Sequence, residues 1–233
     1  MSEPLSYIVF TDFDGTITLR DIGESLFRVF GDPEHVVTSQ GAEAYWRSTC
    51  ETVTSLTPEV FDSFLEDQEI DGSFRRFEEL CSRNGIPIYI LSDGFDVYIE
   101  QVLRRERLSH LPFFSNHLSI GRDGSVVPEF PYTDAECIMC ANCKRNHLLT
   151  RSGENHVIVY IGNGQSDCCP ARYADLVFAK ETLLRFCERE NITYHRFETF
   201  ADVAKKFEEL IASGKPRKRR TAELARKDLF MQG

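Results

Sequence analysis

The stretch "YIVFTDFDGTIT", Tyr7–Thr18, decides the fold. It begins with β-branched and aromatic residues, in a run as long as a buried strand, and it ends in polar residues around a glycine. Two carboxylates, Asp12 and Asp14, follow the apolar run directly. Burying such a pair at a strand end is costly unless a cation or a substrate uses it. The stretch therefore predicts both a central strand and a reactive site.

Three further apolar runs predict buried strands at Ile86–Ser92, His156–Gly162 and Asp175–Ala179. Helical patterns such as "SFRRFEELCSRNG" and "ETLLRFCEREN" lie between the runs. This alternation is typical of an α/β fold with a doubly wound, mostly parallel sheet, which binds ligands at the carboxyl ends of its strands. The segment Phe113–Phe130 differs, because "GRDG" separates two short apolar runs and predicts a β-hairpin.

Residues 19–73 contain only helical or irregular patterns, with a break at Thr57–Pro58, and predict a helical cap domain inserted after the first strand. Residues 1–18 and 74–233 then form the core domain, which ends in a basic tail at 214–233. We interpret this tail as a solvated end or a frayed helix rather than as a contact for RNA or phospholipid.

Composition limits the classes of function. The 233 residues carry a formal charge of −10, which argues against binding nucleic acid or an anionic membrane. No apolar run is long enough to span a bilayer, and no signal-peptide pattern precedes the first strand. We therefore expect a cytoplasmic protein, monomer or homodimer, whose cysteines are reduced unless they bind a metal.

The motifs resemble those of the haloacid-dehalogenase-like phosphatases. Their first motif, Asp-x-Asp-x-Thr, matches Asp12 to Thr16, and Ser92 matches the Ser or Thr of their second motif. Lys144 matches the lysine of the third, and "YIGNGQSD", Tyr160 to Asp167, matches the acidic turn of the fourth. The resemblance covers the whole core. It implies a Rossmann-like fold with a small helical cap and a hairpin between the second and third motifs.

The resemblance also implies roles for these residues. Asp12 would attack phosphorus and form an aspartyl-phosphate, and Asp14 would act as general acid and base. Ser92, Asp93 and Lys144 would bind the phosphoryl group. A magnesium ion is implied, with these ligands: Asp12, the backbone carbonyl of Asp14, Asn163 and Asp167.

One position departs from the family pattern. The family usually has an aspartate directly after the first glycine of the fourth motif, whereas this chain has Asn163. An amide oxygen can ligate magnesium but does not neutralise its charge. We therefore expect weaker magnesium binding than in a relative with aspartate at this position.

The short insertion after the first motif resembles the phosphoserine-phosphatase-like branch. Within it, the cysteine-rich segment before Lys144 is similar to two groups, the methionine-salvage phosphatases and the phosphoethanolamine/phosphocholine phosphatases. The stretches "FTDFDGTITLRD" and "AKETLLRFCEREN" look more like the first group, which acts on a small metabolite, 2-hydroxy-3-keto-5-methylthiopentenyl-1-phosphate. A phosphoserine phosphatase is the runner-up, and the segment "GNGQSDCCP" is similar to the phosphoethanolamine/phosphocholine phosphatases. The alternative from another class is a non-catalytic regulator that binds phosphate or a metal.

Two further groups of residues have more than one interpretation. In the cap, Asp21 and Glu24 could face the substrate or serve as acids in a first helical turn, and Arg47 could contact a substrate carboxylate. Five cysteines could bind Zn²⁺, remain packed thiols or form a disulfide. They are Cys137, Cys140, Cys143, Cys168 and Cys169.

Overall fold

The structure is a computed structural model that describes residues 4–32, 34–35, 41–135, 137 and 139–232. The prediction that no export signal precedes the first strand falls partly on residues 1–3, which lie outside this set. The chain divides into two compact units. The first unit comprises Met1–Asp12, Ile70–Ile90 and Lys144–Gly233, and the second comprises Phe13–Glu69 and Leu91–Cys143. The cap and core boundaries expected from the sequence stay a prediction.

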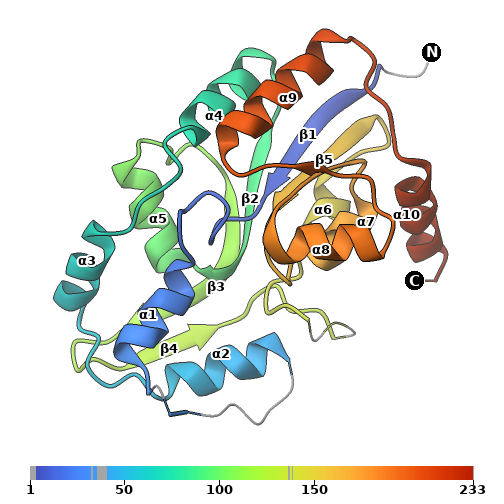
Figure 1. The fold of residues 1–233 in the computed structure, drawn as a ribbon. Coiled ribbons are helices and arrows are strands. Elements are labelled where there is room, and N and C mark those ends of the chain that lie inside the picture. Colours follow the sequence, from blue (N-terminus) through green and yellow to red (C-terminus); the bar gives the residue numbers. More distant parts are fainter. Residues whose placement is uncertain (1–3, 33, 36–40, 136, 138, 233) are drawn as a thin grey trace. The chain divides into compact units, whose positions relative to one another are not determined.

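In the described part of the chain, the strands form one seven-stranded sheet in the order β4-β3-β2-β1-β5-β6-β7 (Figure 1). β1 pairs in parallel with both β2 and β5, and β6 continues the parallel pairing from β5 to β7. The order runs outward from β1 in both directions, which confirms the doubly wound α/β fold class. In sheet order the strands are β4 (Val126–Glu129), β3 (Phe113–Ile120), β2 (Ile88–Phe95), β1 (Ser6–Thr11), β5 (His156–Gly162), β6 (Leu176–Ala179) and β7 (His195–Arg196).

All four strands predicted from apolar runs are present. β5 has the predicted bounds, and β2 continues past Ser92 to Phe95. β6 begins after Asp175, whose carboxylate accepts a hydrogen bond from the backbone N–H of Ile158 at 2.9 Å. Side chains of β1 and β5 are buried along most of their length, as a strand with neighbours on both sides requires.

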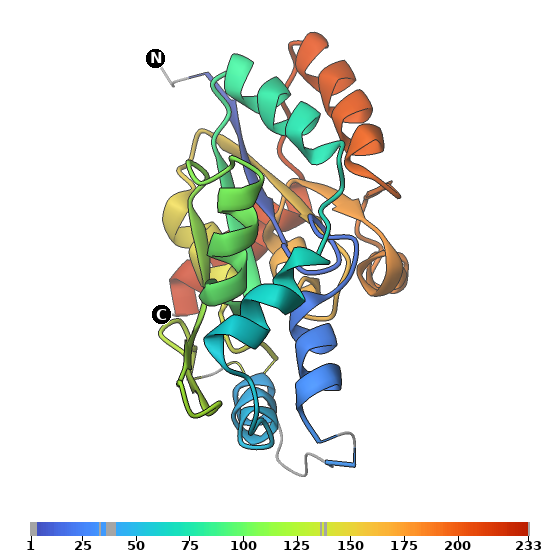
Figure 2. The same cartoon turned by 90° about the vertical axis from the view of Figure 1, so that its left-hand side faces the viewer.

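Helices of the first unit pack on each other and on these strands. α4 and α9 lie side by side in both views (Figures 1 and 2), and the rings of Phe77 and Phe200 are 5.4 Å apart between them. No helix in the described residues is long and apolar enough to cross a membrane. The helices of this unit are α4 (Phe74–Arg83), α6 (Lys144–Arg151), α7 (Cys168–Tyr173), α8 (Glu181–Arg189), α9 (Phe200–Ala212) and α10 (Arg220–Gln232).

The second unit holds the segment predicted to be helical and the predicted hairpin. Its helices are α1 (Ile22–Phe30), α2 (Ala42–Cys50), α3 (Pro58–Glu66) and α5 (Asp96–Arg105). The predicted break at Thr57–Pro58 marks the start of α3, where the Thr57 hydroxyl accepts the N–H of Val60. β3 and β4 pair in the antiparallel direction, which confirms the hairpin.

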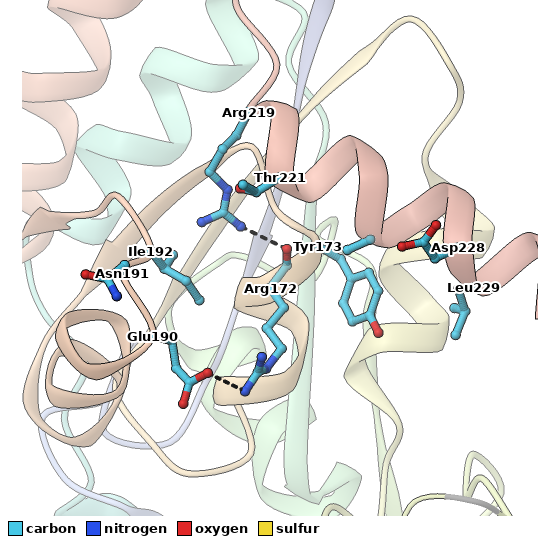
Figure 3. Close-up of a pocket in the computed structure, with 10 residues that line it drawn as sticks. Arg172, Tyr173, Glu190, Asn191, Ile192, Arg219, Thr221, Asp228 and Leu229 are labelled. Carbon is cyan, nitrogen blue, oxygen red and sulfur yellow. Dashed lines mark hydrogen bonds and ion pairs between the residues drawn. The ribbon is translucent and has the colours of Figure 1, made fainter.

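The interpretation of the basic tail as a solvated end is wrong. α10 packs on the first unit, and its Ala222 is fully buried (Figure 1). Arg226 forms an ion pair with the buried Asp175 at 2.9 Å, and Arg219 donates to the backbone carbonyl of Ala171 at 2.7 Å. α10 and α7 also line a cavity of about 370 Å³ (Figure 3). The basic residues that suggested a solvated tail therefore include those that attach it.

Candidate active site

In the first unit, Lys144 lies between two carboxylates. Its side chain is fully buried, and its Nζ lies 2.5 Å from Asp12 Oδ1 and 2.7 Å from Asp167 Oδ1. Burial alone would lower the pKa of Lys144, but the charges and hydrogen bonds of Asp12 and Asp167 outweigh burial and raise the pKa above its ordinary value. The ammonium is therefore charged at any working pH and holds the first-motif and fourth-motif aspartates together.

Asp167 accepts hydrogen bonds with both of its carboxylate oxygens. Besides Lys144, its Oδ1 accepts from the Tyr160 hydroxyl at 2.6 Å, and its Oδ2 accepts the backbone N–H groups of Asn163 at 2.9 Å and Gly164 at 2.8 Å. A Cβ atom on Gly162 would lie 2.5 Å from Asp167 Oδ2, so this arrangement requires glycine there. Asp167 thus fixes the turn after β5.

Asn163, the departure from the family pattern, has an acidic neighbour. Its Nδ2 donates to Glu181 Oε2 at 2.9 Å, and its backbone carbonyl accepts the N–H of Leu183 at 2.9 Å. Glu181 has a left-handed φ of 51°, which is unfavourable for a residue other than glycine or asparagine. A carboxylate from the first residue of α8 therefore lies beside the Asn163 amide.

In the second unit, Asp14 is held by neutral donors. Its Oδ2 accepts from the Tyr98 hydroxyl at 2.8 Å and from the Ser92 hydroxyl at 3.0 Å, and its Oδ1 accepts the backbone N–H of Ile22 at 3.0 Å. Ile22 is the first residue of α1, so the carboxylate also lies at a helix N-terminus, where negative charge is stabilised. Burial, and then the charges of Asp14 and Asp21, raise the pKa of Tyr98 well above its ordinary value. Its hydroxyl is therefore a permanent donor.

Asp93 anchors the loop that leads to Lys144. Its Oδ1 accepts the backbone N–H groups of Ala141 at 2.6 Å and Asn142 at 2.8 Å. The Asn142 amide in turn donates to the backbone carbonyls of Ser92 and Phe114, each at 2.8 Å. The side chain of Asp93 thus positions the protein's own backbone, and its predicted phosphate contact stays a prediction.

The cysteines are all free thiols in the described residues. A hydrogen bond with Cys143, and then burial, raise the pKa of Cys140, which favours the protonated thiol over a metal-binding thiolate. In the first unit, the Cys168 thiol donates to the backbone carbonyl of Gly164 at 3.7 Å. Within residues 4–232, apart from the gaps given above, no three His, Cys, Asp or Glu side chains form a group that could hold a metal ion. Zinc binding by these cysteines stays a prediction.

The cap residues take different positions in the second unit. Asp21 caps α1 by accepting the N–H of Glu24 at 2.7 Å, which agrees with the interpretation of both residues as helix-start acids. Arg47 pairs with Glu43 at 2.8 Å and lies 4.7 Å above the ring of Phe130. Arg47 also lines a pocket of about 520 Å³, which we call the α2 pocket.

Hard oxygen donors fit magnesium in the first unit. The buried cluster of Asp12, Asp167 and Lys144 has a net charge of −1, so a phosphate group would bring further negative charge to it. The Asp12 carboxylate and the Asn163 amide of this unit carry oxygen atoms of the kind that magnesium prefers and that can ligate it directly. Such a set of ligands includes an amide, so it differs from a group of three His, Cys, Asp or Glu side chains, which the described residues lack. Both oxygens of Asp167 accept hydrogen bonds from protein donors.

The chain matches the model of a family described as "Putative Phosphatase" over residues 7–184. The chain belongs to this phosphatase family. The phosphatase is 31% identical to "Pdp3-interacting factor 1" of Schizosaccharomyces pombe, over 91% of this chain and 100% of that protein. It is 29% identical to a 2-hydroxy-3-keto-5-methylthiopentenyl-1-phosphate phosphatase of Bacillus pumilus, over 87% of this chain and 91% of that protein.

Solved structures agree on the fold of the phosphatase. A substrate-bound phosphoserine phosphatase complex aligns with a TM-score of 0.65 at 18% identity, over 88% of this chain and 99% of that chain. A phospho-aspartyl intermediate analogue of phosphoserine phosphatase aligns with a TM-score of 0.62 at 15% identity, over 87% and 99%. The predicted haloacid-dehalogenase-like family, fold and enzyme class, a phosphoric monoester hydrolase, are confirmed. Family membership favours the enzyme over the non-catalytic regulator, and the activity assay described below tests the choice.

Four residues of these clusters were not predicted from the sequence. Tyr160 lies inside a buried strand and Tyr98 inside a helix, so both look like core residues in the pattern. Glu181 looks like an ordinary first-turn acid, and Asn142 like part of a cysteine-rich loop. Only the polar tip of each tyrosine in an otherwise apolar segment could have suggested a partner.

Proposed function

We propose that this phosphatase hydrolyses a small phosphorylated metabolite in a magnesium-dependent reaction through an aspartyl-phosphate on Asp12. The observation that carries the proposal is the buried Lys144 Nζ, 2.5 Å from Asp12 Oδ1 and 2.7 Å from Asp167 Oδ1. The ammonium holds one oxygen of Asp12, which orients the carboxylate for attack through the other. The same cation is available to stabilise the charge of the phosphoryl oxygens in the transition state.

Asp14 is the proposed general acid and base. As the Asp12 oxygen bonds to phosphorus, the bond to the leaving oxygen breaks, and Asp14 gives that oxygen its proton. Asp14 then takes a proton from the water that attacks the aspartyl-phosphate, which releases inorganic phosphate and restores Asp12. Ser92 is the proposed hydroxyl donor to a phosphoryl oxygen, for which its single O–H would turn from Asp14 Oδ2 towards the bound substrate. When bound, magnesium would neutralise phosphate charge, and its proposed ligands are Asp12, the Asp14 backbone carbonyl and Asn163. Asp167 fixes the turn that carries Asn163.

The proposed substrate is 2-hydroxy-3-keto-5-methylthiopentenyl-1-phosphate. The support is the set of relatives that carry this name, such as the Bacillus pumilus protein, which align along most of their length. Phosphoserine is the second candidate, because the basic Arg47 lines the α2 pocket and could pair with a substrate carboxylate. A cytoplasmic location stays a prediction.

Two assays test this proposal. The first measures hydrolysis of p-nitrophenyl phosphate with magnesium by the wild-type protein and by Asp12→Asn, which keeps the shape of the side chain and removes its charge. Turnover by the wild type and its loss in the variant are expected, whereas equal turnover would overturn the role of Asp12. The second compares a panel of phosphometabolites. Phosphoserine would replace the methylthiopentenyl phosphate as the proposed substrate if its kcat/KM were higher and if Arg47→Ala abolished that preference.

A further inference from the structure

Tyr98 presents a phenolic hydroxyl group to Asp14. It lies on α5, its side chain is fully buried, and its hydroxyl donates to Asp14 Oδ2 at 2.8 Å. The Ser92 hydroxyl donates to the same oxygen while it accepts the backbone N–H of Gly94 at 2.9 Å. Asp14 Oδ1 accepts from Ile22 at the start of α1. Donors from three separate segments of the second unit therefore set the rotation of one carboxyl group.

Two glycines leave room for this hydroxyl. A Cβ atom on Gly94 would lie 1.6 Å from the Tyr98 hydroxyl oxygen and 2.6 Å from Asp14 Oδ2, so no side chain fits there. A Cβ atom on Gly23 would lie 3.2 Å from the same hydroxyl oxygen. The ring of Phe13, the residue between the two aspartates, stacks on the ring of Tyr98 with centroids 6.4 Å apart. The second unit thus encloses the hydroxyl and aims it at Asp14.

We propose that Tyr98 is a positioning residue that holds the Asp14 carboxyl group in the orientation from which it protonates the leaving oxygen. This inference rests on the proposed function. In the step concerned, the Asp12 oxygen bonds to phosphorus, the bond between phosphorus and the leaving oxygen breaks, and the Asp14 proton moves to the leaving oxygen. Tyr98 keeps its own proton throughout, so its contribution is geometric.

The test uses substrates that differ in their need for a proton. p-Nitrophenolate leaves readily without protonation, whereas an alkoxide does not, so only alkyl phosphates depend strongly on the general acid. For Tyr98→Phe we expect kcat/KM for an alkyl phosphate to fall by roughly 10- to 100-fold. For p-nitrophenyl phosphate we expect a fall of no more than about threefold. Tyr194→Phe is the matched control, since its exposed hydroxyl donates to Glu188 at 2.9 Å and both substrates should be unaffected.

Two unnatural side chains separate positioning from packing, and they apply even if Tyr98→Phe does not fold. 4-Aminophenylalanine at position 98 keeps a donor at the end of the ring and should restore the wild-type ratio of the two kcat/KM values. 4-Methylphenylalanine fills the same space without a donor and should lower the alkyl phosphate value selectively.

Three results would overturn the inference. Equal losses for both substrates would mean that Tyr98 serves the fold alone, and undiminished alkyl phosphate hydrolysis would mean that Asp14 does not need it. A wild-type protein that hydrolyses neither substrate with magnesium would overturn the proposed function and the role of Tyr98 together, and is distinguishable from the other two because it appears before any substitution.

Discussion

Asp12 and Asp14 are separated by one residue in the chain and are held in opposite ways. Asp12 belongs to a buried cluster in which a full positive charge, Lys144, bridges two carboxylates. Asp14 is held by two hydroxyl groups and a backbone N–H group, none of which is charged. The difference concerns the kind of partner, since both carboxylates are hydrogen-bonded.

This contrast matches the two proposed roles. A nucleophile must stay ionised, and a fixed ammonium beside it strongly favours the charged carboxylate. A general acid and base must gain and lose a proton in each cycle, and hydroxyl and backbone N–H donors can fix its position without adding a full positive charge of their own. Two aspartates with the same side chain therefore have different partners: an ammonium group contacts Asp12, and hydroxyl and backbone N–H groups orient Asp14.

The largest predicted effect comes from breaking the charged cluster. Lys144→Met leaves Asp12 and Asp167 buried without their cation, so the free energy of unfolding should fall by about 3 to 5 kcal/mol and phosphatase activity should be lost. Urea denaturation and p-nitrophenyl phosphate hydrolysis measure the two effects. Lys206→Met is the control, because its pair with Glu209 is exposed and should contribute no more than about 1 kcal/mol. A Lys144 variant as stable as the control would contradict the account.

The next effect tests the close approach that fixes Asp167. In Gly162→Ala the new Cβ would lie 2.5 Å from Asp167 Oδ2, so the turn must shift, at a cost of about 1 to 3 kcal/mol. Gly164→Ala is its matched control, because its Cβ would lie 3.7 Å from the same oxygen, an ordinary contact. Urea denaturation of both variants should separate them, and equal unfolding midpoints would show that the turn tolerates a side chain at either position.

A smaller effect concerns magnesium. Asn163→Asp adds a carboxylate to the proposed ligands, so magnesium affinity should rise by roughly tenfold. Because the new carboxylate would face Glu181 in place of the present 2.9 Å hydrogen bond, the metal-free variant should lose thermal stability. Adding Glu181→Gln should restore that stability and keep the higher affinity. Calorimetric titration with magnesium measures the affinities, and unchanged values in both variants would remove Asn163 from the ligand set.

The last effect is absent at neutral pH and appears only on acidification. It arises at His147, one turn after Lys144 on α6. Burial, and then the charge of Arg151, lower the pKa of His147 from 6.5 to about 4. Between these values the unfolded chain binds a proton that the folded chain does not, so this stability is complete above pH 6.5 and is lost as the pH falls towards 4. The loss should reach about 3 kcal/mol by pH 4. Unfolding midpoints of the wild type and of His147→Gln, measured from pH 7 to pH 4 with exposed His110→Gln as control, test this pH dependence. Parallel pH profiles of the wild type and His147→Gln would contradict it.

Much of the fold was predictable because it depends on local patterns. Strand β5 matches its apolar run residue for residue, and Pro58 after Thr57 marks the start of α3. The tail shows where such patterns fail. Its basic composition indicated a solvated end, yet Ala222 is buried and Arg226 pairs with Asp175. Composition averages over a segment, whereas docking depends on the few side chains that face the neighbouring helix.

The candidate site was also predictable only where it depends on local sequence motifs. The ordered motifs predicted Lys144 and Asp167 as site residues, and Lys144 Nζ lies within hydrogen-bond distance of both Asp12 and Asp167. The two tyrosines that donate to Asp14 and Asp167 were not predictable. Tyr98 contacts an aspartate far from it in the sequence, and Tyr160 lies in a strand whose pattern resembles ordinary core. Such pairings arise from tertiary packing, and no period or spacing in one sequence encodes them.

The central claim is that Asp12, and not Asp14, bonds to phosphorus. The most direct measurement is to mix the protein with substrate and magnesium, reduce the acyl phosphate with borohydride, and map the product by peptide mass spectrometry. Reduction converts an aspartyl-phosphate to homoserine. The account predicts homoserine at position 12 and unmodified aspartate at position 14. Homoserine at position 14, or turnover with no reduced aspartate at either position, would contradict it.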